Sequence, residues 1–320
     1  MAKQGGSGMN RREFTRVLGL SAFALSCSRA NPMVTKPRPQ VSLTMDDFGW
    51  QNPVRLSSAE RNRAILSTLE KHRLKAALFV TARNIDNDEG KQLLSAWDNA
   101  GHLIGNHTYS HRDFANPVTT LADYQADILR AEELLKNFRQ FRRYFRFPML
   151  REGESEVKRD GLRTFLSQHG YEMGYVTIDN SDWLVDMRLT ERLRTNPKAD
   201  IKPYREYYLE HMWDRAQYYD QLAQKTLGRS VPHTILTHFS LLNALFLDDL
   251  IGMFKSKGWE WIDAEKALSD PVFSKRPSIL PAGQSIVWAL AKENGTIPMS
   301  QRYPAEDGEI ELARIKKAGL

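Results

Sequence analysis

Short β-rich runs alternate with longer stretches of helical period from residue 41 to residue 262, and this alternation constrains the fold more than any other feature. The strand-like runs are 41–45, 75–80, 102–105, 144–147, 171–178, 233–237 and 259–262. The helical stretches between them include 57–69, 89–99, 121–138, 156–169 and 241–257. Repeated strand–helix units predict a parallel sheet with right-handed crossovers. With seven strand candidates, we expect a closed or nearly closed α/β barrel, with functional groups at the carboxyl ends of its strands.

Two segments lie outside this alternation. Residues 184–230 are too long for one connection, and their aromatic spacing, from Tyr204 to Tyr219, predicts a helical insertion in which these side chains pack between helices. A platform that binds sugar rings is the alternative for these aromatic side chains. Residues 270–320 are rich in turn signals, and we expect them to wrap the barrel. Residues 41–320 are therefore expected to form one barrel domain with an insertion and a C-terminal tail.

The net charge of +6 is confined to the first 40 residues. Residues 1–40 hold seven basic residues against Glu13 alone, whereas residues 41–320 hold 38 basic and 38 acidic residues. Proteins bind nucleic acids through an excess of basic side chains, and the part expected to fold has no such excess. We therefore expect no nucleic-acid partner.

Residues 1–30 have the organisation of an export signal. Arg11 and Arg12 precede an apolar stretch, 17–26, and small residues follow it. This stretch of about ten residues is too short for a bilayer core, which needs roughly 20. Paired arginines followed by Phe14 resemble a twin-arginine signal, and an ordinary signal with a chance Arg-Arg pair is the alternative. We expect an exported protein of the periplasm or cell envelope.

Cys27 is the only cysteine, so an intramolecular disulfide is excluded and cysteine-based metal chemistry is not expected. It directly follows the apolar stretch, in a sequence that resembles a lipoprotein cleavage box. A lipidated Cys27 would attach the protein to a membrane; cleavage after Ala30 is the alternative that the sequence leaves open. Residues 31–40 contain three prolines and are expected to be a linker.

Acid, base and metal-ligand side chains follow five of the seven strand-like runs. They are Asp46 and Asp47, His107 and His111, Arg146 to Pro148, Asp179 to Trp183, and Leu236 to His238. Since the carboxyl ends of parallel barrel strands meet at one face, we expect these side chains to form one site. Histidines four residues apart share one face of a helix or turn, a spacing suited to a single metal ion.

These motifs resemble the five motifs of the polysaccharide deacetylases with the NodB-homology fold, carbohydrate esterase family four. The resemblance extends over residues 41–260. It implies a distorted (β/α)7 barrel of NodB-homology type that hydrolytically removes acetyl groups from N-acetylated sugars. Met45 replaces the Phe that is usual in the first motif, and Met149 replaces the Tyr or Gly that often follows the third.

The resemblance implies a metal site formed by Asp47, His107 and His111. Two imidazoles and one carboxylate, with no thiolate, suit one Zn²⁺ ion best. The ion would act as a Lewis acid and activate water.

The resemblance also implies the groups that transfer protons. Asp46 would be the general base, kept ionised and oriented by Arg146. His238 would be the general acid that protonates the leaving amine, and Asp182 would orient and charge its ring.

Four further residues are expected to contact the substrate. The backbone N–H of Met149 would stabilise the oxyanion together with the metal. Leu236 would line the pocket for the acetyl methyl group, and Trp183 would form a wall of the groove. Trp50, close to the two aspartates, is a candidate for stacking on a sugar ring.

We therefore expect an exported deacetylase whose partner is an N-acetylated glycan, such as peptidoglycan, an exopolysaccharide or a chitin-like oligosaccharide. An O-acetyl esterase acting on xylan or another acetylated polysaccharide would use the same motifs. An alternative of another class is a carbohydrate-binding barrel without turnover, although such a protein would be expected to lose the base or the acid. The sequence gives no indication of the oligomeric state.

Overall fold

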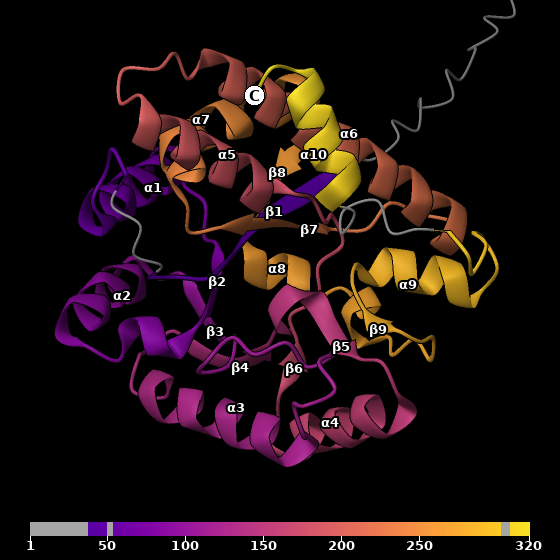
Figure 1. The fold of residues 1–320 in the computed structure, drawn as a ribbon. Helices are drawn as coiled ribbons and strands as arrows, with labels where there is room; N and C mark the ends of the chain where they lie inside the picture. Colours follow the sequence, from indigo (N-terminus) through magenta and orange to yellow (C-terminus); the bar gives the residue numbers. More distant parts are fainter. Residues whose placement is uncertain (1–37, 50–53, 302–307) are drawn as a thin grey trace, which may run out of the picture. The chain divides into compact units, whose positions relative to one another are not determined.

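A curled parallel sheet forms the centre of the computed structural model, which describes residues 38–49, 54–301 and 308–320 (Figure 1). The export signal expected in residues 1–30, with Cys27, lies outside the described residues. So do Trp50 and most of the linker expected in residues 31–40.

The order of the strands follows from the repeated strand–helix units. Six strands pair in parallel in the order β6-β4-β3-β2-β1-β7. They are β1 (Gln40–Asp46), β2 (Ala77–Val80), β3 (Leu103–Asn106), β4 (Phe141–Phe145), β6 (Glu172–Met173) and β7 (His233–His238). A seventh strand, β8 (Glu260–Trp261), pairs in parallel with the amino end of β1. The parallel α/β architecture expected from the sequence is confirmed.

The two edges of this sheet are joined by the residues that follow β6. The N–H of Gly174 donates to the carbonyl of Phe145 on β4 at 2.7 Å, and the N–H of Leu236 on β7 donates to the carbonyl of Ile178 at 3.0 Å. Ile178 also forms an isolated parallel bridge with Ile235. The run predicted as one strand, 171–178, is therefore a short strand followed by an isolated bridge.

The helices of the repeated strand–helix units pack around the sheet (Figure 1). They are α1 (Ser58–His72), α2 (Asp88–Ala100), α3 (Leu121–Leu135), α4 (Glu156–Gln168) and α7 (Leu241–Ser256). A capping box is present at the start of α1, where the Ser57 hydroxyl accepts from the N–H of Glu60 and the Glu60 carboxylate accepts from the N–H of Ser57.

Two helices occupy the long segment after the barrel closure, α5 (Asp182–Thr195) and α6 (Lys202–Leu227). The side chains of Tyr208 and Tyr219 on α6 are fully buried. Because a buried ring cannot stack on a bound sugar, these two residues pack between helices, as expected.

The C-terminal part of the chain pairs with a segment near the middle of the sequence. Strand β9 (Ala282–Gly283) is antiparallel to β5 (Arg151–Gly153). The other elements of this part are α8 (Ala264–Leu268), η3 (Pro271–Ser274), α9 (Ile286–Glu293) and α10 (Gly308–Lys317). Helix α10 lies beside α5 and α6 (Figure 1).

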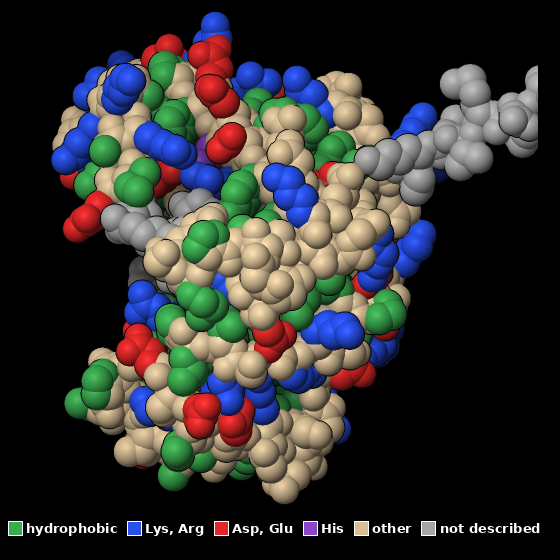
Figure 2. Space-filling model, turned by 90° about the vertical axis from the view of Figure 1, so that its right-hand side faces the viewer, with side chains coloured by type: hydrophobic (Ala, Val, Ile, Leu, Met, Phe, Trp, Pro, Cys, Tyr) green, Lys and Arg blue, Asp and Glu red, His purple; other side chains and the backbone are tan. Residues whose placement is uncertain are grey.

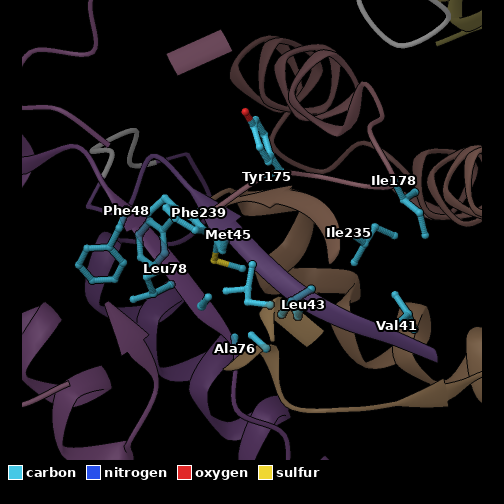
Figure 3. Packing of buried hydrophobic residues seen from close by; sticks show 14 of the residues in the cluster. Val41, Leu43, Met45, Phe48, Ala76, Leu78, Tyr175, Ile178, Ile235 and Phe239 are labelled. Atoms are coloured by element: carbon cyan, nitrogen blue, oxygen red, sulfur yellow. The ribbon is translucent and has the colours of Figure 1, made fainter. Parts of the chain in front are cut away.

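The core is continuous around β1, whose residues from Val41 to Asp46 are all buried. Such a run is expected of a parallel strand covered on both faces. Met45 is fully buried, which is worth about 1.5–3 kcal/mol for a side chain of this size. Just beyond the strand, the rings of Phe48 and Phe239 lie side by side, with centroids 4.8 Å apart (Figure 3).

The surface agrees with the balanced charge of residues 41–320. Lys and Arg side chains are intermingled with Asp and Glu side chains on the face shown in Figure 2. Among the described residues, no helix has the length and apolar character needed to cross a membrane.

Candidate active site

Two adjacent carboxylates at the end of β1 serve different partners. Asp46 is the last residue of the strand and is 3% exposed, whereas Asp47 has a left-handed backbone (φ 57°) and a side chain 31% exposed. The change in backbone direction between them separates the two side chains. Asp46 contacts Arg146, and Asp47 contacts His111.

Asp47, His107 and His111 converge on one point. Each offers one ligand atom, and the three atoms lie within 4.8 Å of one another. Oδ1 of Asp47 is 3.1 Å from Nε2 of His111 and 3.9 Å from Nε2 of His107. Thr81, at the end of β2, donates its hydroxyl to the same Asp47 oxygen at 3.2 Å. This set of one carboxylate and two imidazoles matches the ligands that Zn²⁺ prefers.

The two histidines meet on a turn and not on a helix. Thr108 and His111 have left-handed backbones, with φ of 64° and 58°. Asn106, the last residue of β3, fixes the start of this turn, because its side-chain oxygen accepts from the N–H of Thr108 at 2.8 Å. The Thr108 hydroxyl then accepts from the N–H of His111 at 3.0 Å. The four-residue spacing therefore brings both rings together without helical geometry.

The protonation states of these residues suit a cation. Burial lowers the pKa of His107 to about 4, so its ring is neutral at pH 7. Its Nδ1–H donates to the backbone carbonyl of Arg146 at 2.8 Å, which leaves the Nε2 lone pair free to bind an ion. Burial tends to raise the pKa of Asp47, but the hydrogen bond with His111 and the charges of nearby histidines hold it well below its usual value.

Asp46 is held by a buried guanidinium. Nη1 of Arg146 donates to Oδ1 of Asp46 at 2.7 Å and to the hydroxyl of Thr44 at 3.0 Å. Nε of Arg146 donates to the carbonyl of Gly174 at 2.7 Å, and the guanidinium lies 3.9 Å from the centroid of the Phe79 ring. The second Asp46 oxygen is 3.7 Å from Nε2 of His107, so one carboxylate reaches both the arginine and the metal site.

His238 lies at the end of β7 and is paired with a fully buried carboxylate. Nδ1–H of His238 donates to Oδ1 of Asp182 at 2.7 Å, and the backbone N–H of His238 donates to Oδ2 of Asp182 at 3.0 Å. Burial by itself lowers the pKa of His238, but Asp182, with smaller contributions from Asp47 and Asp46, raises it to about 10. At neutral pH the imidazole is therefore protonated, as a proton donor must be.

Met149 provides a backbone N–H at the side of the pocket. Met149 and Leu150 both have left-handed backbones, each with φ of 54°. No hydrogen bond among the described residues uses the N–H of Met149. Leu150, Val176 and Leu236 form a small buried apolar cluster next to it. A free N–H beside an apolar cluster fits an acetyl group, whose oxygen and methyl need these two environments.

One pocket of about 350 Å³ brings these groups together. Its lining residues are Asp46, Asp47, His107, His111, Met149, Leu150, Arg151, Asp179, Asn180, Trp183, Leu236 and His238. Trp183 is 44% exposed and forms part of the wall. Arg146 and Asp182 do not line the pocket; they lie behind Asp46 and His238, to which they bind. Of the predicted site residues, only Trp50 lies outside the described part of the chain.

Sequence reasoning missed residues that orient the pair of Asp182 and His238. Asn243 on α7 donates to Oδ2 of Asp182 and to the carbonyl of His238, both at 3.0 Å. Asn180 accepts from the N–H of Asp182 at 3.0 Å and donates to the carbonyl of Leu236 at 2.7 Å. Asn180 lies inside a predicted motif, and this position could have identified it from the sequence. Asn243 lies on a helix outside the motifs, and nothing in the sequence around it indicated its role.

A parallel α/β sheet with a possible metal-ligand set, a carboxylate bound to arginine and an imidazole bound to a carboxylate at its strand ends is an arrangement suited to hydrolysis. Residues 33–174 match the polysaccharide deacetylase family. This match confirms, over these residues, the resemblance inferred from the motifs. The matched range includes the first three motifs and ends before Asp182 and His238, which the fold brings to the same site.

Two curated relatives are similar to parts of this chain. A peptidoglycan-N-acetylglucosamine deacetylase of Bacillus cereus is 27% identical over 146 residues, which cover 46% of this chain and 47% of that protein. The peptidoglycan-N-acetylmuramic acid deacetylase PdaA of Bacillus subtilis is 24% identical over 211 residues, which cover 66% of each chain. The chain thus spans about half the length of the first relative and about two thirds of the second.

Solved structures of deacetylases and of a related pseudoenzyme align with more than two thirds of this chain. A peptidoglycan N-acetylglucosamine deacetylase has a TM-score of 0.48 and 20% identity, with 73% of this chain and 89% of that chain covered. Bacillus subtilis PdaA has a TM-score of 0.47 and 20% identity, with coverages of 72% and 81%. A Bacillus anthracis protein described as a family pseudoenzyme has a TM-score of 0.49 and 17% identity, with coverages of 73% and 67%.

Proposed function

We propose that this protein is a metal-dependent deacetylase that hydrolyses the acetamido group of an N-acetylated glycan. The observation that carries this proposal is the arrangement of Asp46 and His238 in one pocket with the metal-ligand triad. A held carboxylate and a protonated imidazole are the base and the acid that amide hydrolysis needs. The substrate class follows from the similarity to deacetylases that act on peptidoglycan.

The metal would be held by Asp47, His107 and His111. A Zn²⁺ ion bound there would supply a Lewis acid and lower the pKa of water. The fit of the site rests on the neutral ring of His107, whose Nδ1–H is already used by a carbonyl, and on the convergence of the three ligand atoms.

The reaction consists of addition of water and loss of an amine. Asp46 accepts a proton from the attacking water as the oxygen forms a bond with the acetyl carbon. The Met149 N–H donates to the acetyl oxygen as it becomes negative, and Leu236 with Leu150 surrounds the methyl group. His238 then gives its proton to the sugar nitrogen as the carbon–nitrogen bond breaks. The products are acetate and a free amino sugar.

The supporting residues keep both proton-transfer groups in position. Arg146 restrains Asp46 through a bond to Oδ1, which leaves the second oxygen directed toward the metal site. Asp182 fixes the tautomer of His238, because Nδ1 donates to it and Nε2 is left to carry the transferred proton. The retention of both Asp46 and His238 favours a catalytic protein over a carbohydrate-binding barrel without turnover.

Acetate release from matched N-acetylated and O-acetylated oligosaccharides tests the proposal. The purified mature chain should release acetate from N-acetylated peptidoglycan, chitin-like or exopolysaccharide fragments, and His238→Ala should release it about 10²–10⁴-fold more slowly. Release from O-acetylated xylan alone would instead assign an O-acetyl esterase. Binding to these glycans without acetate release, at full metal occupancy, would assign a binding protein and overturn the proposal.

We also propose that the protein is exported to the periplasm or cell envelope, on the basis of the leader sequence alone. Replacing Arg11 and Arg12 with Lys should retain the precursor in the cytoplasm if the signal is of the twin-arginine type. Cys27→Ala should move the exported protein from the membrane fraction to the soluble fraction if Cys27 is lipidated. Identical fractionation of Cys27→Ala and the parent protein would exclude a lipid anchor at Cys27 and would not affect the proposal of export.

A further inference from the structure

Helix α10, near the C-terminus, inserts a carboxylate into the protein interior. Glu311 lies in the first half of this helix and is 1% exposed. It accepts a hydrogen bond from the hydroxyl of Tyr207 and lies 3.3 Å from Nη2 of Arg215, both on α6. At the start of the same helix, a Cβ placed on Gly308 would lie 3.7 Å from the ring of Trp183 in the pocket wall. Helix α10 therefore reaches both the insertion and the edge of the site (Figure 1).

Glu311 also contacts His211, a buried histidine of α6 that the proposed reaction does not use. Oε1 of Glu311 is 3.2 Å from Nδ1 of His211, and His211 is 5% exposed. Burial tends to raise the pKa of Glu311, but its contacts with His211, Tyr207 and Arg215 lower it to about 2. The carboxylate is therefore ionised at neutral pH and accepts hydrogen bonds from the side chains that face it.

The other nitrogen of His211 binds the backbone next to a catalytic motif residue. The N–H of Ser181 donates to Nε2 of His211 at 2.9 Å. Because a backbone N–H is always a donor, Nε2 must carry the lone pair and Nδ1 must carry the hydrogen. That hydrogen faces Glu311. The carboxylate thus selects the only tautomer of His211 that can hold the Ser181 N–H.

Ser181 precedes Asp182 at the amino end of α5, so its backbone sets the direction of the Asp182 side chain. Asp182 in turn binds Nδ1 of His238 at 2.7 Å. The backbone of Ser181 therefore connects two carboxylate–imidazole pairs. One pair is Glu311 with His211, and the other is Asp182 with His238. The first pair does not line the pocket, whereas His238 of the second pair does.

We propose that His211 and Glu311 are positioning residues for the catalytic acid, so that helices α6 and α10 complete the active site. This inference rests on the proposed deacetylase function and assigns a role to the insertion and to the C-terminal helix. Burying a carboxylate and an imidazole costs more free energy than packing apolar side chains of the same size. If helix α10 only packed against α6, apolar side chains would serve better than Glu311 and His211. If it holds the Ser181 N–H, the buried carboxylate and imidazole are required.

The experiment compares His211→Phe, Glu311→Leu and Glu311→Gln with wild type. We expect kcat on an N-acetylated oligosaccharide to fall about 10–100-fold in the first two variants, part of the 10²–10⁴-fold that general acid catalysis provides. KM and metal content should stay unchanged, and the alkaline limb of the pH profile should move to lower pH. Glu311→Gln keeps a side-chain oxygen that accepts from Nδ1 and should recover part of the rate. Glu309→Leu, an exposed position on the same helix, is the matched control.

Folding effects are separated by measuring rates per folded, metal-loaded protein. If the variants lower only the melting temperature and leave kcat and the pH profile at wild-type values, the positioning role is wrong. A readout without turnover separates this inference from the proposed function. The pKa of the His238 ring, followed by NMR, should fall in His211→Phe because Asp182 is no longer held against it. An unchanged His238 pKa would overturn the inference even if the wild-type enzyme is active, and a lowered one would support it even if no deacetylation is found.

Discussion

The backbone carbonyl of Arg146 accepts a hydrogen bond from Nδ1 of His107 at 2.8 Å, while the Arg146 side chain binds Asp46 at 2.7 Å. One residue of the third motif therefore orients both a proposed metal ligand and the proposed base. The two functions use different atoms. A substitution of the side chain removes the contact with the base and keeps the carbonyl that orients His107.

Arg146→Met should consequently separate base function from metal binding. We expect the variant to retain about one divalent ion per chain and to lose activity, by at most the 10²–10⁴-fold that a general base contributes. It should also lose about 3–5 kcal/mol of stability, because the buried Asp46 carboxylate is left unpaired. Metal analysis, acetate release and urea unfolding measure the three quantities.

The control for this variant is Arg143→Met. Arg143 pairs with Glu132 at 2.7 Å, but its side chain is 53% exposed, so its loss should cost less than about 1 kcal/mol. Loss of the ion in Arg146→Met would contradict the prediction, because it would show that metal binding depends on the Arg146 side chain.

His111→Ala should lose the metal ion. Within the described part of the chain, the ring of His111 supplies one of the three candidate ligand atoms, and the two remaining ligands would hold the ion weakly. Chelation of the wild-type protein should abolish activity. It should also lower the free energy of unfolding by about 2.7 kcal/mol, compared with protein in a solution whose free metal concentration is 100 times the Kd. Elemental analysis and thermal unfolding test both effects, and His169→Ala, an exposed histidine, is the control. Turnover that survives complete removal of the metal would refute the metal site.

Asp46→Asn and His238→Ala should keep the ion and the fold but slow turnover, each by about 10²–10⁴-fold. Neither side chain belongs to the triad that converges on the metal position. Single-turnover rates at saturating substrate, measured with metal content on the same samples, distinguish this result from loss of metal. A near-normal rate in His238→Ala would assign the acid to another residue.

Asp182→Asn should move the alkaline limb of the pH–rate profile to lower pH. The acid must be protonated to act, and Asp182 is the main group that raises the pKa of His238 to about 10 against the effect of burial. Removing the carboxylate charge should lower that pKa by about 1–3 pH units, the usual effect of one close charge. A bound divalent ion lowers the pKa of His238 in both wild type and Asp182→Asn. The quantity to compare is therefore the difference between the two pH–rate profiles. Profiles that coincide would show that another group sets this limb.

The sequence predicts the barrel and the pocket because both depend on local patterns. Polar residues that interrupt apolar runs mark strand ends, and parallel topology brings those ends together, as Asp46 and His238 show. The closure of the barrel was not predictable in detail. It depends on a few backbone hydrogen bonds, one from Gly174 to β4 and two between Ile178 and β7, and neither residue type signals this.

The buried pair of His211 and Glu311 was missed for a related reason. The two residues are far apart in the sequence, and each belongs to a helix whose polar positions are mostly exposed. His211 by itself is equally consistent with packing. Only the three-dimensional contact with the Ser181 N–H relates it to the site.

A last prediction concerns stability in acid, which His102 should limit. Its Nδ1 accepts a hydrogen bond from the N–H of Ala76 at 3.1 Å, and its side chain packs beside the ring of Trp97. Burial, with a smaller effect of Lys75, lowers the pKa of His102 to about 4, against about 6.5 in the unfolded chain. Between these pH values the unfolded state binds more protons, so stability is complete above pH 6.5 and falls as the pH is lowered toward 4.

The loss attributable to His102 is about 3 kcal/mol once the pH is below 4. His102→Asn keeps an oxygen that accepts from the Ala76 N–H but cannot take up a proton, so its unfolding free energy should decrease less between pH 7 and pH 4.5. Urea unfolding of both proteins at several pH values gives the difference, and His169→Asn is the matched control because that histidine is exposed. Equal pH dependence in wild type and His102→Asn would mean that the acid sensitivity originates in other groups.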